Sequence, residues 1–182
     1  MEFEILYAIN NMHDPILDKI MVALTTLGDA GIIWIILALV LICIKKTRRC
    51  GLLILLALIT GLILGNGILK NVITRSRPCW IDQSIPLLIP NPHDYSFPSG
   101  HTLASFEAAI MIFLHNKKWG IVTIIIAAFI SFSRMYLFVH FPTDILGGII
   151  LGAVISISLY HLWNKLEKIR EEKEQINVEK RG

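Results

Sequence analysis

The sequence predicts an all-α protein, a polytopic membrane bundle of about six transmembrane helices. Hydrophobic residues make up 54% of the 182 residues and charged residues only 17%, against about 25% in soluble domains. Several stretches carry no charge, and a helix needs about 20 mostly apolar residues to cross the hydrocarbon layer. Lysine and arginine gather between these stretches, as in the cytoplasmic loops of membrane proteins. A soluble fold would lack the polar surface that so many apolar helices require.

The apolar stretches place the helices along the chain. An interfacial helix is expected over 1–12, because its apolar residues share one face. The segment 15–27 carries Asp18 and Lys19 near its start, so it either spans with its charged ends at the surface or lies in the interface. The expected spans cover 15–27, 30–44, 50–72, 98–115, 119–137 and 143–163.

The charge distribution sets the orientation of this membrane-embedded domain, 1–164. Basic residues are densest at 45–49, at 117–118 and in the charged tail, 165–182, and we expect these three segments in the cytoplasm. The intervening loops would then face outward. If 15–27 spans, both termini lie inside and the 1–12 helix rests on the inner surface. The net charge of +3 fits this topology and gives no reason to expect a nucleic-acid partner.

The first polar group on the predicted outer side contains Lys70, Arg75 and Arg77. Lys70 and Arg77 are seven residues apart and would share a face if one helix continued through both. Side chains at a helix end can reach the surface for structural reasons alone. Segments on the outer side of a membrane usually contain few lysines and arginines, and three cations there are an exception to this rule. The exception favours an anion-binding site.

The second group is Pro-Ser-Gly-His at 98–101, where an apolar helix is expected to begin. Ser99 suits an N-cap position, and Gly100 allows a ligand to approach the backbone closely. Free N–H groups at a helix start bind anions. Most such starts are only caps, so this motif is weak by itself.

The third group contains Ser133, Arg134, His140 and Asp144. An acidic residue such as Asp144 stabilises the first turn of a helix, whether or not it has a catalytic role. A buried carboxylate beside an imidazole also fixes the tautomer and supports the positive charge of the ring. The pair therefore suits a histidine that attacks or transfers a proton.

Together, the three groups suit a phosphoryl group. Cations and backbone donors match its non-bridging oxygens, while one histidine attacks phosphorus and another protonates the leaving oxygen. Since no carboxylates cluster in the sequence, we expect neither a metal ion nor a cofactor. The motifs are Lys70-x6-Arg77-Pro78, Pro98-Ser99-Gly100-His101 and Ser133-Arg134-x5-His140-x3-Asp144. In order and spacing they resemble the three signature motifs of the type 2 phosphatidic acid phosphatase superfamily.

This resemblance implies a metal-independent lipid phosphatase with a helical-bundle fold. It implies that His140 is the nucleophile and forms a phosphohistidine, that Asp144 orients it, and that His101 is the acid and later the base. The remaining motif residues would bind the phosphoryl group: Lys70, Arg77, Ser99, Gly100 and Arg134.

The expected substrate is a lipid phosphate or diphosphate at the outer face of a bacterial plasma membrane. Undecaprenyl diphosphate, phosphatidylglycerol phosphate and phosphatidic acid are the candidates. Dedicated undecaprenyl diphosphate phosphatases of this family often carry Asp where Gly100 stands, which favours a broader lipid phosphatase. The sequence leaves the oligomeric state open.

Two other functions remain open at this point. A lipid phosphotransferase on the same fold would use the same residues, and an anion channel or transporter would use the cations for selectivity. The channel leaves the pair of His140 and Asp144 without a role. Glu107 also stands out, because a charge inside a span is unfavourable unless it is paired or protonated. It either pairs with a cation or lines the entry path of the lipid.

Overall fold

The computed structural model describes residues 1–179, and these residues form helices and loops without any strand. Residues 180–182, which include Lys180 and Arg181 of the expected tail, lie outside the described residues. The helices are α1 (Glu2–Asn10), α2 (Pro15–Leu27), the short 3-10 helix η1 (Asp29–Gly31), α3 (Ile32–Cys43), α4 (Arg48–Gly61), the π-helix η2 (Leu62–Leu69), α5 (Lys70–Ile73), α6 (Pro78–Ile81), α7 (Gly100–His115), α8 (Lys117–Tyr136) and α9 (Pro142–Glu179). The all-α membrane bundle that the sequence predicts is confirmed.

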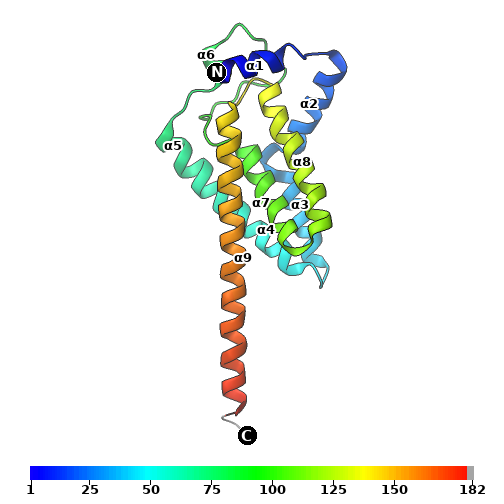
Figure 1. Cartoon of the computed structure of the whole chain (residues 1–182), viewed down its shortest axis with the longest axis vertical. Coiled ribbons are helices and arrows are strands. Elements are labelled where there is room, and N and C mark those ends of the chain that lie inside the picture. The colour runs from blue at the N-terminus through cyan, green and yellow to red at the C-terminus, as the bar shows by residue number, and fades with distance from the viewer. Residues whose placement is uncertain (180–182) are drawn as a thin grey trace.

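Helix α7 lies at the centre of the bundle and packs against α4, α8 and α9 (Figure 1). Its packing on α9 is close because Gly152 presents no side chain there. A Cβ at Gly152 would come within 3.1 Å of the Leu103 carbonyl oxygen. Small residues allow membrane helices to approach in this way. The central position of α7 brings its first turn, which carries His101, into the interior.

Within residues 1–179, three helical runs are long and apolar enough to cross a membrane: Arg48–Ile81, Lys117–Tyr136 and Pro142–Asn177. Helices α2 and α3 meet the same criterion only as one run, bent by 44° at η1. With 13 residues, α2 is about 20 Å long, shorter than a hydrocarbon layer of about 30 Å. The separate spans over 15–27 and 30–44 stay a prediction, since α2 and α3 qualify together by length and composition only.

The position of α1 differs from the expected one. Helix α1 sits at the same end of the bundle as α6, whereas α9 extends beyond the other helices at the opposite end (Figure 1). The hydroxyl of Tyr7 in α1 donates to Asp82, just after α6, at 2.8 Å. Helix α1 therefore lies at the end of the bundle opposite the basic turn at 45–49, whereas the six-span arrangement places it beside the basic turns.

Candidate active site

Lys70 and Arg77 come together through a break in the helix rather than along one helix. Helix α5 ends at Ile73 because Thr74 adopts a left-handed conformation, with φ of 48°. The shared helix face that the seven-residue spacing suggests therefore does not form. Instead, Lys70 and Arg77 both form ion pairs with Asp94, in the loop before α7.

Asp94 is a residue that the motif analysis did not select. Partial burial alone would raise the pKa of its carboxyl, but hydrogen bonding and charge from Lys70, together with Arg77, lower the pKa to about 2. Asp94 thus remains a carboxylate at neutral pH and occupies the two cations. Its position in the loop just before the second motif suggests contact with substrate or a role in access to the site, but no spacing signal pairs it with Lys70 and Arg77.

Arg77 is buried and connects this loop to the histidine of the third motif. Its Nε donates to the Asp94 carbonyl oxygen at 2.7 Å, and its Nη1 donates to the Val139 carbonyl oxygen at 2.9 Å. The same Nη1 lies 3.0 Å from Nε2 of His140. Since a guanidinium can only donate, this contact assigns the lone pair to Nε2 of His140.

The other ring nitrogen of His140 faces Ser96 and Asp144. Nδ1 lies 3.3 Å from Ser96 Oγ and 3.5 Å from Asp144 Oδ2, and Ser96 Oγ donates to that same carboxylate oxygen. Nδ1 of His140 is therefore connected to Asp144 chiefly by hydrogen bonds through the Ser96 hydroxyl. Sequence reasoning missed Ser96, because a serine in a loop carries no recognisable spacing signal.

Asp144 is itself held from three sides. It accepts from the Phe141 backbone N–H at 2.8 Å and from Arg75 Nη1 at 2.7 Å, in addition to Ser96. Arg75 also forms an ion pair with Glu2 of α1. It therefore links Asp144 to α1 and is more than a side chain that reaches the surface from a helix end. Burial, and then the charges of Arg77 and Arg134, lower the pKa of His140 well below its usual value. These contacts keep the His140 imidazole neutral.

The second histidine of the motifs, His101, has its own carboxylate. Its Nε2 lies 2.8 Å from Oδ1 of Asp29, in η1 between α2 and α3. The motifs lie entirely within 70–144, so they give no indication of a partner from the N-terminal quarter of the chain. The bend at η1 is what brings Asp29 over the start of α7.

The remaining phosphate-binding candidates surround the start of α7. Arg134 is buried near the end of α8, where Nη1 donates to the hydroxyl of Thr25 and Nε has no partner among the described residues. Ser99 precedes α7 at the expected cap position, but its side chain does not cap the helix. Its Oγ accepts from Thr102 Oγ1 at 3.1 Å instead. The polar atoms of Arg134 are thus more available to a ligand than the Ser99 hydroxyl.

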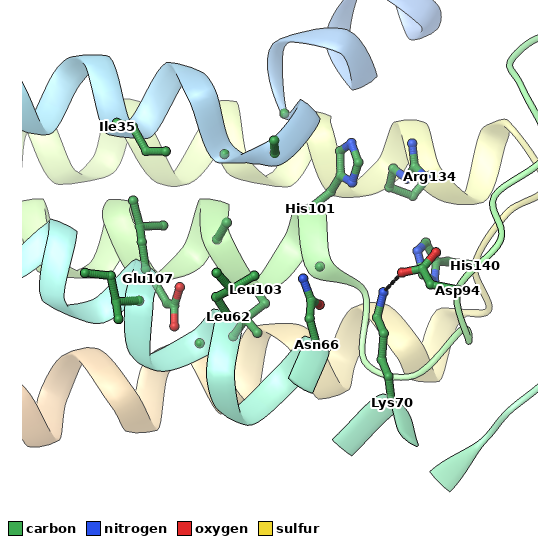
Figure 2. A pocket seen from close by; sticks show the side chains of 18 of the residues that line it. Ile35, Leu62, Asn66, Lys70, Asp94, His101, Leu103, Glu107, Arg134 and His140 are labelled. Carbon is green, nitrogen blue, oxygen red and sulfur yellow. Dashed lines mark hydrogen bonds and ion pairs between the residues drawn. The ribbon is translucent and has the colours of Figure 1, made fainter. Parts of the chain in front are cut away.

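One cavity of about 610 Å³ joins these groups. Six of the eight candidate residues line it: Lys70, Arg77, Gly100, His101, Arg134 and His140. The other two, Ser99 and Asp144, are buried beside it. Figure 2 shows Lys70, His101, Arg134 and His140 at one end of this cavity, and Ile35, Leu62, Leu103 and the single acid Glu107 toward the other. An anionic head with an apolar tail matches such a cavity, because the cations attract the former and the apolar walls the latter.

Comparisons with known proteins identify the family of the chain. A family model described as the PAP2 superfamily matches residues 51–168. An undecaprenyl-diphosphatase of Sulfolobus acidocaldarius is 35% identical over 154 residues, which cover 84% of this chain and 74% of that protein. The phosphatidylglycerophosphatase B of Bacillus subtilis is 32% identical over 174 residues, covering 88% of this chain and 82% of that protein.

Two solved structures share the fold. A crystal structure of a transmembrane PAP2 type phosphatidylglycerolphosphate phosphatase from Bacillus subtilis superposes with a TM-score of 0.73 at 30% identity, covering 89% of this chain and 84% of that one. The crystal structure of Aquifex aeolicus LpxE gives a TM-score of 0.79 at 27% identity, covering 88% of this chain and 94% of that one.

Proposed function

The chain belongs to the PAP2 superfamily, and from this premise we propose that it hydrolyses a lipid phosphate monoester or diphosphate without a metal ion. Undecaprenyl diphosphate and phosphatidylglycerol phosphate are the proposed substrates, because similar proteins are named for them, and phosphatidic acid is a third. The observation that carries the proposal is Nε2 of His140, which holds its lone pair toward Arg77 beside a cavity lined by three cations.

In the first step, Nε2 of His140 attacks phosphorus and the bond from phosphorus to the leaving oxygen breaks. His101, protonated at the start, gives its proton to that oxygen, so a lipid alcohol or a lipid monophosphate leaves. The proton on Nδ1 of His140 stays in place, held through Ser96 to Asp144. This arrangement stabilises the positive charge that the ring gains as a phosphohistidine.

In the second step, water attacks the phosphorus of the phosphohistidine. His101, now neutral, accepts a proton from this water, the bond between phosphorus and nitrogen breaks, and inorganic phosphate leaves. Asp29 supports the charged form of His101 in both steps, because its carboxylate lies 2.8 Å away.

Binding of the phosphoryl group by Lys70 and Arg77 requires a change at Asp94, since its carboxylate occupies both cations. The substrate phosphate competes with Asp94 for them. Arg134 and the backbone N–H of Gly100 complete the set of donors to the non-bridging oxygens. The Ser99 hydroxyl is bonded to Thr102, so Ser99 contributes to the phosphate site mainly by its position directly before α7.

We also propose that the site opens at the outer face of the plasma membrane, with residues 1–164 embedded and 165–182 in the cytoplasm. The position of the basic turns, at the end of the bundle opposite the site, supports this orientation. In a Cys43→Ala background, an impermeant thiol reagent on intact cells should label Gln83→Cys, in the loop after α6, and leave Lys118→Cys, at the start of α8, unlabelled. The reverse pattern would contradict the orientation.

The activity is tested by phosphate release from a panel of lipid phosphates and diphosphates. The wild-type protein should release phosphate from at least one of them, and His140→Ala should release none while keeping its helical content. The matched control is His161→Ala, because His161 is exposed on α9. Near-normal release by His140→Ala would contradict the assignment of the nucleophile.

A further inference from the structure

We propose that Glu107 determines substrate specificity by donating a hydrogen bond to an ester carbonyl of a glycerolipid phosphate. The inference rests on the proposed function and deepens it, since it selects the glycerolipid phosphates from the candidate substrates. Glu107 lies outside the three motifs, and the reaction steps above do not use it.

Glu107 is a buried acid that has no partner among residues 1–179. Its side chain lies on α7 at the cavity and is 1% exposed. Its Oε1 is buried and accepts no hydrogen bond, and no cation of residues 1–179 forms an ion pair with it. A buried polar group without a partner is rare in folded proteins. A ligand in the cavity can supply the missing partner.

The opposite wall is shaped to hold this carboxyl. A Cβ on Gly61, at the end of α4, would lie 2.0 Å from Oε1 of Glu107, so a larger residue at 61 would force the carboxyl out of its present position. The neighbouring cavity walls are apolar, with Leu62 and Leu103 between Glu107 and the cationic end (Figure 2). The carboxyl is therefore a single polar group at the apolar end of the cavity.

An apolar site within the membrane favours the neutral form of a carboxyl, because an unpaired charge there is strongly unfavourable. A neutral carboxyl carries one O–H donor. It therefore needs an acceptor such as a carbonyl oxygen. A polyprenyl chain offers only hydrocarbon and would leave the donor unsatisfied, which disfavours binding of that chain.

The spacing along α7 fits an ester linkage. Glu107 follows Gly100 by seven residues, two turns of helix, so it shares the face of Gly100 about 10 Å further along the axis. In a diacylglycerol phosphate the ester carbonyl oxygen lies about 6 Å from phosphorus by standard bond lengths. A hydrogen bond of about 3 Å extends this reach to about 9 Å. This falls about 1 Å short of the rise along α7, a gap that the Glu107 side chain, about 4 Å from Cα to its carboxyl oxygens, is long enough to bridge from a phosphoryl group at Gly100.

The test compares two lipids that differ only at the proposed contact. Phosphate release is measured with didodecanoyl-glycerol phosphate, which has ester linkages, and with the didodecyl ether analogue, which lacks both carbonyls. The wild-type protein should have a clearly higher kcat/KM for the ester. Glu107→Leu should lower this ester-to-ether ratio about tenfold, the effect of one hydrogen bond. Glu107→Gln should keep most of the ratio, because its amide also donates.

Glu172→Leu is the matched control, since Glu172 is exposed on the distal part of α9; its ratio should equal that of the wild type. The inference is overturned if the wild-type ester-to-ether ratio is near one, or if Glu107→Leu has the same ratio as the wild type. The proposed function is tested separately, and phosphate release from these lipids or from farnesyl diphosphate upholds it. If the wild type releases phosphate from farnesyl diphosphate alone, only the inference fails. If it releases none from any lipid, both fail. Should Glu107→Leu not fold, the wild-type and Glu107→Gln ratios still decide.

Discussion

Replacing Asp94 with asparagine should strengthen substrate binding while destabilising the fold. The carboxylate of Asp94 holds Lys70 and Arg77, so it competes with the phosphoryl group for the same cations. Its amide counterpart carries no charge and competes less. The two cations then repel each other without compensation in the free protein, which lowers its stability.

The size of both effects follows from the pKa of Asp94. A pKa of about 2 lies nearly two units below the ordinary value of about 3.9, which corresponds to ~2.5 kcal/mol. Because the Asp94 side chain is 56% exposed, solvent screening reduces this to ~1 kcal/mol. The substitution should thus lower KM about fivefold and the free energy of unfolding by about 1 kcal/mol.

The assay is phosphate release over a range of lipid phosphate concentrations, with thermal unfolding measured on the same samples. Asp82→Asn is the control, because Asp82 lies in the same loop and bonds Tyr7 rather than the cations. The competition should persist from pH 5 to 8, since the stabilising charge of Asp94 is present above pH 3.9 and is lost only as the pH falls through about 2. An unchanged or higher KM in Asp94→Asn, or a large loss of kcat, would refute the competition.

Three further predictions concern the histidine network and the charges of the site. Ser96→Ala should lower kcat by about tenfold to a hundredfold with little change in KM, because the link from His140 to Asp144 is lost. Ser96→Thr keeps the hydroxyl and should recover part of kcat. Equal losses of kcat in both variants would contradict a positioning role for Ser96. Burial lowers the pKa of His140, so its nucleophilic nitrogen should stay unprotonated below pH 6.5 and the His140-dependent loss of rate should begin only at lower pH. The unfolded chain takes up that proton first, so stability should fall as the pH drops below 6.5, as checked by thermal unfolding at pH 7.5 and 5.5. Dialysis against EDTA should leave phosphate release intact, because Lys70 and Arg77 supply the positive charge; a loss that Mg²⁺ restores would argue for a metal.

The sequence by itself determined the helical membrane bundle and the residues of the three motifs. Ionisable residues are rare in an apolar chain, so Lys70, His101 and His140 stand out against their surroundings. Their spacing also resembles a known family, which the comparisons confirm. The composition of the chain was sufficient for the fold class, because few alternatives can satisfy backbone hydrogen bonds inside a membrane.

Only the tertiary structure decided which residues support those motifs. Ser96 and Asp94 lie in a loop and Asp29 in the short helix η1, and their roles arise from contacts with segments far away in the chain. The left-handed turn at Thr74 is a local backbone state that hydrophobic patterning does not reveal. Nor does patterning distinguish two short spans from one bent run.

Glu107 illustrates the same difference between what the sequence determines and what the tertiary structure determines. The sequence identifies it as an acid inside an apolar helix and leaves open whether it pairs with a cation or lines the lipid path. The fold answers this, since Gly61 makes room for the carboxyl and the apolar walls offer it no partner. The physical reason is that hydrogen-bond satisfaction depends on which groups meet in space, and the order of residues along the chain does not specify this.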